Sequence, residues 1–204
     1  MTDPESKVMS TKKGFLQGYN AQAVANEDQV IVAASVTDCQ NDIGQLHPMI
    51  EAIKTSLAEA GIEERPGTLL ADAGYCSKEN LAALDDYDPD VYVATRNMKK
   101  NPTPATDRRG RLRKNATLVE QTDRKVSNKA GRALYRKPQQ IIEPIFAQIK
   151  DGRHIRCFMR RGKVAAASEW KLICGTHNLL KLYRRAFANP DTVSFSRQAV
   201  PIAG

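Results

Sequence analysis

The sequence predicts an α/β fold, in which helices flank a mixed β-sheet. Short strand-forming runs alternate with amphipathic helical segments between residues 19 and 94, which is typical of such folds. The chain has 204 residues, 41% of them hydrophobic and 26% charged, which suits one soluble domain with its own core.

The first predicted elements are a β-hairpin and a helix. Strand-forming residues occupy 19–24 and 29–36 and are separated by a polar turn at 26–28. Apolar residues at steps of four, three and four then predict an amphipathic helix that ends at Gly61. These residues are Leu46, Ile50, Ile53 and Leu57. Asp42 precedes this helix, and a capping role for it is favoured over a metal-binding one.

The main candidate for a catalytic acid follows a short buried strand. The apolar residues 68–71 predict this strand, and Asp72 lies at its carboxyl end, where sites collect in α/β folds. Ala73 and Gly74 are small, so a metal or substrate can approach the carboxylate closely. The alternative, which the pattern alone favours, is that Asp72 caps the following turn. A helix at 78–84, capped by Ser77, and a strand at 91–94 follow.

Positive charge is concentrated in residues 96–137. The formal net charge of the chain is +8 and its pI is about 9.4, so its surface attracts polyanions such as nucleic acid. Pro102, Pro104 and Gly110 predict an irregular first half for this insertion, and the alternative is a solvated polar loop. The candidate DNA-binding residues here are Arg108, Arg109, Arg111, Arg113, Lys114, Arg136 and Lys137.

Two stripes of apolar residues at helical spacing predict helices in the C-terminal part of the chain, residues 138–188. The first stripe is Ile141, Ile145 and Ile149, and the second is Ala166, Trp170, Ile173, His177 and Leu180. Glu143 and Lys150 are seven residues apart, so a straight helix would place them on one face. Pro144 disfavours helical geometry at Glu143, which predicts a kink or a helix start there.

The remaining features exclude several classes of protein. The four cysteines are widely spaced without a C-x-x-C pair, which argues against a zinc site or a disulfide framework and fits the cytoplasm. No apolar run approaches the ~20 residues needed to span a bilayer, so no membrane partner is expected. Residues 1–14, including Asp3, are expected to form a disordered linker, and residues 189–204 a disordered tail.

Several segments of the sequence together resemble a known family. They are residues 18–24, 31–34, 41–42, 71–75, 143–146 with 149–150, 158–162, 169–172 and 177–179. In this order and spacing they resemble the catalytic domain of DDE transposases of bacterial insertion sequences, in the IS1182-like branch of the IS4 and IS5 type. The resemblance covers residues 3–182, most of the chain.

The resemblance implies a ribonuclease-H-like fold in which three acids hold two Mg²⁺ or Mn²⁺ ions. Asp72 matches the second acid, Glu143 the third, and Lys150 the lysine of the Y-R-E-K signature. Gln139 and Arg136 replace the arginine and the tyrosine of that signature. No residue before Gly14 matches the first acid, so the resemblance predicts a copy truncated at the N-terminus. Residues 15–95 and 138–188 would form the catalytic domain.

The resemblance also predicts the activity and the partners. The expected activity is metal-dependent cleavage and strand transfer of double-stranded DNA, at transposon ends and at the target. The alternative is a catalytically inactive DNA-binding remnant of a transposase. A homodimer or an upstream-encoded transposase fragment would be the protein partner.

Overall fold

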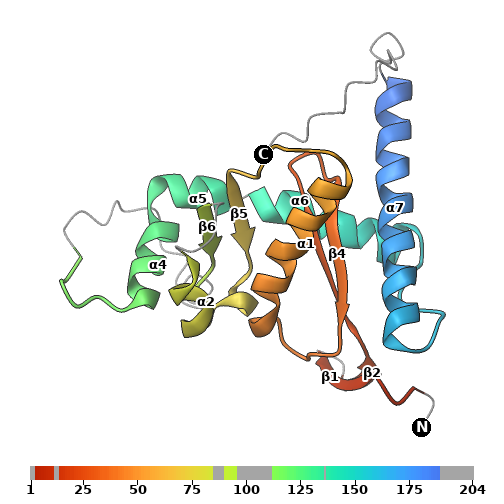
Figure 1. The fold of residues 1–204 in the computed structure, drawn as a ribbon, viewed down its shortest axis with the longest axis horizontal. Helices are drawn as coiled ribbons and strands as arrows, with labels where there is room; N and C mark the ends of the chain where they lie inside the picture. Colours follow the sequence, from red (N-terminus) through yellow and green to blue (C-terminus); the bar gives the residue numbers. More distant parts are fainter. Residues whose placement is uncertain (1–2, 12–13, 85–89, 96–111, 136, 189–204) are drawn as a thin grey trace. The chain divides into compact units, whose positions relative to one another are not determined.

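The computed structural model describes residues 3–11, 14–84, 90–95, 112–135 and 137–188, and its fold is mixed α/β, as predicted (Figure 1). The chain divides into two compact units. The first unit comprises Met1–Gln40, Met49–Glu64 and Ile141–Ala203, and the second comprises Asn41–Pro48 and Arg65–Gln140. In the described part of the chain the strands form three sheets of two strands each.

An N-terminal strand pair in the first unit lies where the sequence predicted a disordered linker. Strand β1 (Lys7–Thr11) pairs antiparallel with β2 (Gly14–Gly18), with Lys7 opposite Gly18 and Thr11 opposite Gly14. Residues 7–11 contain no long apolar repeat, and backbone pairing with β2 orders them instead. The linker assignment is therefore wrong for these residues.

The predicted β-hairpin is confirmed, with a longer turn than expected. Strand β3 (Asn20–Ala25) pairs antiparallel with β4 (Ile31–Thr37). The Gln29 amide donates to the Asn26 carbonyl at 3.0 Å, and Gln29 has a φ of 61°. This left-handed backbone cannot continue a strand, so β4 begins at Ile31 and not at residue 29.

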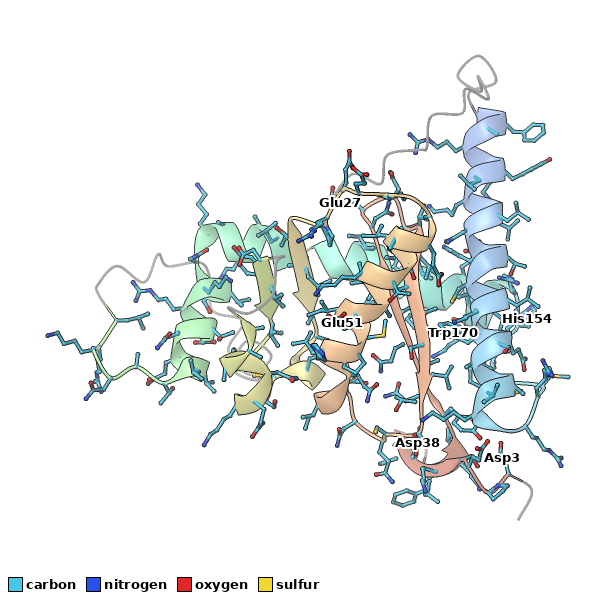
Figure 2. All side chains as sticks on the ribbon, in the orientation of Figure 1. Asp3, Glu27, Asp38, Glu51, His154 and Trp170 are labelled. Atoms are coloured by element: carbon cyan, nitrogen blue, oxygen red, sulfur yellow. The ribbon has the colours of Figure 1, made fainter. Side chains whose placement is uncertain are left out.

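The core of the first unit lies between this hairpin and two C-terminal helices, α6 (Lys137–Ala147) and α7 (Lys163–Ala188). Trp170 on α7 belongs to this core (Figure 2). Its indole N–H donates to the Gln22 carbonyl at 2.8 Å. The Phe146 ring stacks on Trp170 with centroids 5.7 Å apart. The buried cluster contains Ile31, Val36, Ile145, Ile149, Ala166, Trp170, Ile173 and Cys174.

Polar contacts also fix α7 against β4. The Asn178 amide accepts from the Ile31 N–H and donates to the Ile31 carbonyl, each at 2.8 Å. Ala166, Trp170, Ile173 and His177 are buried as predicted, but Leu180 is 36% exposed. The stripe was therefore extended one step too far, because from this point on polar side chains contact the turn of the hairpin, with Lys181 donating to the Gln29 side chain at 2.9 Å.

Helix α6 passes through Pro144 without the predicted break. Pro144 lies inside the helix, and the irregularity comes later, in the π-helix η4 (Gln148–Gly152). The wider turn closes where the Arg153 amide donates to the Gln148 carbonyl at 2.9 Å. Glu143 is therefore helical, and the helix start expected at this residue is wrong, because α6 begins at Lys137.

The second unit contains a parallel strand pair and several short helices. Strand β5 (Thr68–Ala71) pairs with β6 (Asp90–Val93), and Ala71 lies opposite Val93. Helix α2 (Lys78–Ala82) follows β5 and is capped by Ser77, as predicted. The basic insertion contains helices α4 (Leu118–Ser127) and α5 (Lys129–Tyr135), and α4 packs against β6 and α2.

Helix α1 (Leu46–Glu59) begins in the second unit and continues in the first. Its predicted stripe is confirmed, because Leu46, Ile50, Ile53 and Leu57 are all buried. Within the described residues, no helix is long and apolar enough to cross a membrane.

Candidate functional site

Asp72 lies at the carboxyl end of β5, where the sequence predicted it. Strands β5 and β6 are parallel, so their carboxyl ends meet at one edge of the sheet. One oxygen of the exposed Asp72 carboxylate accepts from the Gly74 amide at 3.1 Å, which caps the short helix η2 (Ala73–Tyr75). The capping interpretation of Asp72 is therefore confirmed, and the side chain still reaches solvent.

Asp42 lies against the same turn and does not cap the helix in the way predicted. It occupies the N-cap position of η1 (Ile43–Gln45), but its side chain makes no capping hydrogen bond there. Its carboxylate instead lies beside Gly74, 2.8 Å from the place where a Cβ would stand. A contact between residues 32 positions apart has no local sequence signal, so the capping preference was wrong for this side chain.

The Asn80 side chain joins the two acidic turns. Its amide nitrogen donates to the Ile43 carbonyl at 2.6 Å and to the Tyr75 carbonyl at 2.7 Å. Burial, followed by the charges of Asp42 and Asp72, raises the pKa of the Tyr75 phenol. Two carboxylates and a neutral phenol therefore share this part of the second unit.

Thr95 and Asp123 form a buried pair near the end of β6 that the sequence did not predict. The Thr95 hydroxyl donates to the Asp123 carboxylate at 2.6 Å, and the two residues are only 1% and 9% exposed. Asp123 lies on α4, whose buried face consists of Thr122, Asp123 and Val126. A mostly polar face gives no apolar periodicity, which is why this contact could not be predicted.

Glu143 and Lys150 lie in the first unit, on α6 and on η4. Both are exposed, and the Lys150 ammonium lies 5.2 Å from the centroid of the Phe146 ring. Because a π-helix turns less per residue than an α-helix, the seven-residue spacing no longer places the two side chains on one straight face. Asp72 and Glu143 belong to different units, so their proximity stays a prediction.

The candidate DNA-binding residues are only partly described. Arg108, Arg109, Arg111 and Arg136 lie outside the described residues, as does the side chain of Lys137. Arg113 and Lys114 are exposed before α4, where they line an open hollow with Asn115 and Glu120. The lining of this hollow therefore contains two cationic side chains and the carboxylate of Glu120.

Carboxylate oxygens are the donors that Mg²⁺ and Mn²⁺ prefer, and Asp72 and Glu143 both offer them at exposed positions. The donor chemistry therefore fits a divalent cation. Across the part of the chain that is described, no three His, Cys, Asp or Glu side chains group as a metal site.

The fold and the position of Asp72 define a class of protein: an α/β domain with an acid at the carboxyl end of a parallel strand. The family model described as "Transposase DDE domain" matches residues 3–179, so the chain belongs to this transposase family. No curated protein matches the chain. No solved structure matches it either.

Proposed function

We propose that the chain works as the catalytic domain of a DDE transposase, cutting DNA and transferring strands during transposition of an insertion sequence. The observation that carries this proposal is the exposed Asp72 carboxylate at the carboxyl end of β5, in a chain that belongs to the transposase family. A ribonuclease-H-like sheet and membership of the IS1182-like branch belong to the same proposal.

Each proposed site residue has a separate role. Asp72 and Glu143 would hold the divalent cations, and Lys150 would contact a DNA phosphate as a point charge. The chemistry that two bound Mg²⁺ or Mn²⁺ ions supply is activation of a water or 3′-hydroxyl and stabilisation of the leaving oxygen. Arg113 and Lys114 would hold the DNA backbone without reading bases.

Nicking of labelled double-stranded DNA by the purified chain in Mn²⁺ tests this proposal. Asp72→Asn keeps the size of the side chain and removes its charge, so we expect roughly a 100-fold loss of nicking. Glu143→Gln should cause a similar loss. Asp90→Asn and Glu51→Gln alter exposed acids of the second and the first unit and should leave nicking unchanged.

The DNA-binding alternative gives a different result. A chain that binds DNA in a salt-sensitive way but nicks nothing in Mg²⁺ or Mn²⁺ would favour the inactive remnant. Nicking that persists in Asp72→Asn would instead contradict the assignment of this acid.

A further inference from the structure

Two acidic side chains converge on one glycine in the second unit. The Gly74 amide donates to the Asp72 carboxylate at 3.1 Å, so Asp72 contacts the backbone of this residue. Asp42 contacts the side where a Cβ would stand, with its Oδ2 at 2.8 Å, its own Cβ at 3.4 Å and its Cγ at 3.5 Å from that point. The turn that carries Asp72 is therefore held between two carboxylates.

Space, and not backbone strain, requires glycine at this position. The backbone of Gly74 does not have the positive φ that Gly14, Gly61 and Gly162 show. An added Cβ would lie 2.8 Å from Asp42 Oδ2, closer than real Cβ contacts come, so the carboxylate would have to shift away from this point. Gly74 and Asp42 consequently fit each other as a pair.

Backbone contacts fix Asp42 in this place. The Gln45 amide donates to the Asp42 carbonyl at 2.9 Å and forms the turn of η1. The side-chain amide of Asn80 then joins η1 to η2, because it donates to the backbone carbonyls of Ile43 and Tyr75. The Ser77 hydroxyl caps α2 by accepting from the backbone N–H of Asn80 at 3.1 Å, and this bond holds the backbone of Asn80 in place. Residues 42–45 and 72–80 therefore form one connected support for the Asp72 turn.

We propose that Asp42 is a positioning residue for Asp72, and that its carboxylate, seated on Gly74, fixes the turn so that Asp72 points to a divalent cation. This inference rests on the proposed function, because it assumes that Asp72 binds the cation. An exposed aspartate samples several rotamers, and a supporting residue that restricts its turn raises affinity for the cation by orienting the ligand in advance.

A double-mutant cycle on thermal unfolding tests the contact without any metal. In the wild-type background, Gly74→Ala forces the Asp42 carboxylate away, and we expect Tm to fall by about 2–6 °C. In the Asp42→Ala background the carboxylate is gone, and the nearest neighbour that remains is the Cβ atom at position 42, 3.4 Å away. This is an ordinary contact, so Gly74→Ala should then change Tm little. Equal losses of Tm in both backgrounds would overturn the inference.

A Mn²⁺ titration, followed by NMR line broadening of the Ala73 and Tyr75 amides, tests positioning at Asp72. At 150 mM salt, which screens exposed charges, Asp42→Ala should weaken Mn²⁺ binding roughly tenfold. Asp42→Asn keeps the shape over Gly74, so its binding should stay within about threefold of the wild type. Asp90→Asn, which removes an exposed acid of the second unit at the other end of the β5–β6 pair, is the control and should bind as the wild type does.

The outcomes separate this inference from the proposed function. If Asp42→Asn weakens Mn²⁺ binding as much as Asp42→Ala does, then charge alone matters and positioning is wrong. If the Ala73 and Tyr75 amides of the wild-type chain do not respond to Mn²⁺, the proposed function fails at Asp72. The unfolding cycle still decides whether Asp42 and Gly74 are coupled.

Discussion

His177 is the buried residue with the clearest pH-dependent consequence. It is 1% exposed, and its Nε2 lies 3.0 Å from the Gln29 carbonyl, which can only accept, so Nε2 carries the proton. Nδ1 has no hydrogen-bond partner among the described residues. Burial is the main cause that lowers the pKa of His177, and the hydrogen bond to Gln29 opposes it. The positive charges of Lys181, Arg153 and Arg184 lower this pKa further.

The lowered pKa of His177 predicts that acid destabilises the first unit. The folded state keeps His177 neutral, whereas the unfolded chain binds a proton below its usual pKa of about 6.5. Stability is therefore fully present above that pH and is lost as the pH falls toward the folded pKa. Thermal unfolding should show Tm falling between pH 7.5 and 5.5 in the wild type.

Substitution isolates the contribution of His177 to this pH dependence. His177→Gln removes the titrating group and should flatten the change of Tm with pH. His154→Asn is the matched control, because His154 is exposed and has a φ of 58°, which asparagine tolerates. If His177→Gln and the wild type lose the same Tm on acidification, the burial argument is wrong.

The sequence alone predicted the position of Asp72 but not that of Asp42. Asp72 was predicted at the end of its strand because a local apolar run precedes it. Asp42 was assigned to a cap, since the contact that determines its place, with Gly74, is made only after folding. Whether Glu143 joins Asp72 depends on how the two units pack together, which no local pattern determines.

At the scale of elements, α4 depends on its first turn. The Thr117 hydroxyl accepts from the Glu120 amide at 3.3 Å, and the Glu120 carboxylate accepts from the Thr117 amide at 2.8 Å. This capping box satisfies two amides that the helix itself leaves unpaired. Since the buried face of α4 is mostly polar, the helix has little apolar packing to replace such contacts.

Thr117→Ala should therefore loosen the start of α4. We expect faster hydrogen exchange in its first turns and a Tm lower by about 2–4 °C. Thr117→Ser keeps the accepting oxygen and should behave as the wild type. Unchanged exchange in Thr117→Ala would show that packing against β6 and α2 is sufficient to hold the helix.

The elements that the sequence predicted are those with an apolar face. Helix α1, the buried part of α7 and strand β5 each bury residues at the spacing of their secondary structure. The β1–β2 pair was missed because backbone bonds order it while Phe15 and Leu16 stay exposed. Helices α4 and α5 were not predicted within the basic insertion, because neither has a long series of apolar residues at helical spacing.

At the scale of the whole molecule, the positive charge predicts salt-sensitive DNA binding. Each phosphate that a cation neutralises contributes about −0.9 to the slope of log K against log salt on duplex DNA. Arg113→Gln with Lys114→Gln should therefore reduce the steepness of this slope by about 1.8, measured by fluorescence anisotropy between 50 and 200 mM salt. The loss of affinity should be similar for different DNA sequences.

A matched double variant controls for the loss of charge in general. Lys54→Gln with Lys171→Gln removes two exposed cations outside the basic insertion and should leave the slope unchanged. If both double variants reduce the slope equally, net charge and not the insertion governs binding.

Asp3 and Glu5, near the beginning of the chain, hold the start of helix α7. Gly162 donates to the Asp3 carboxylate at 3.0 Å, which is the main reason that the pKa of Asp3 is lowered, and Lys163 donates to the Glu5 carboxylate at 2.7 Å. Asp3 and Asp38 lie near the N-terminal end of α7, and Lys163 forms an ion pair with Asp38 (Figure 2).

These contacts impose an order on folding during protein synthesis. Asp3 leaves the ribosome 159 residues before Gly162, its partner. The N-terminal segment must therefore wait for most of the nascent chain before it finds its place, and such distant pairing is slow. Assembly of the first unit can finish only after translation has passed α7.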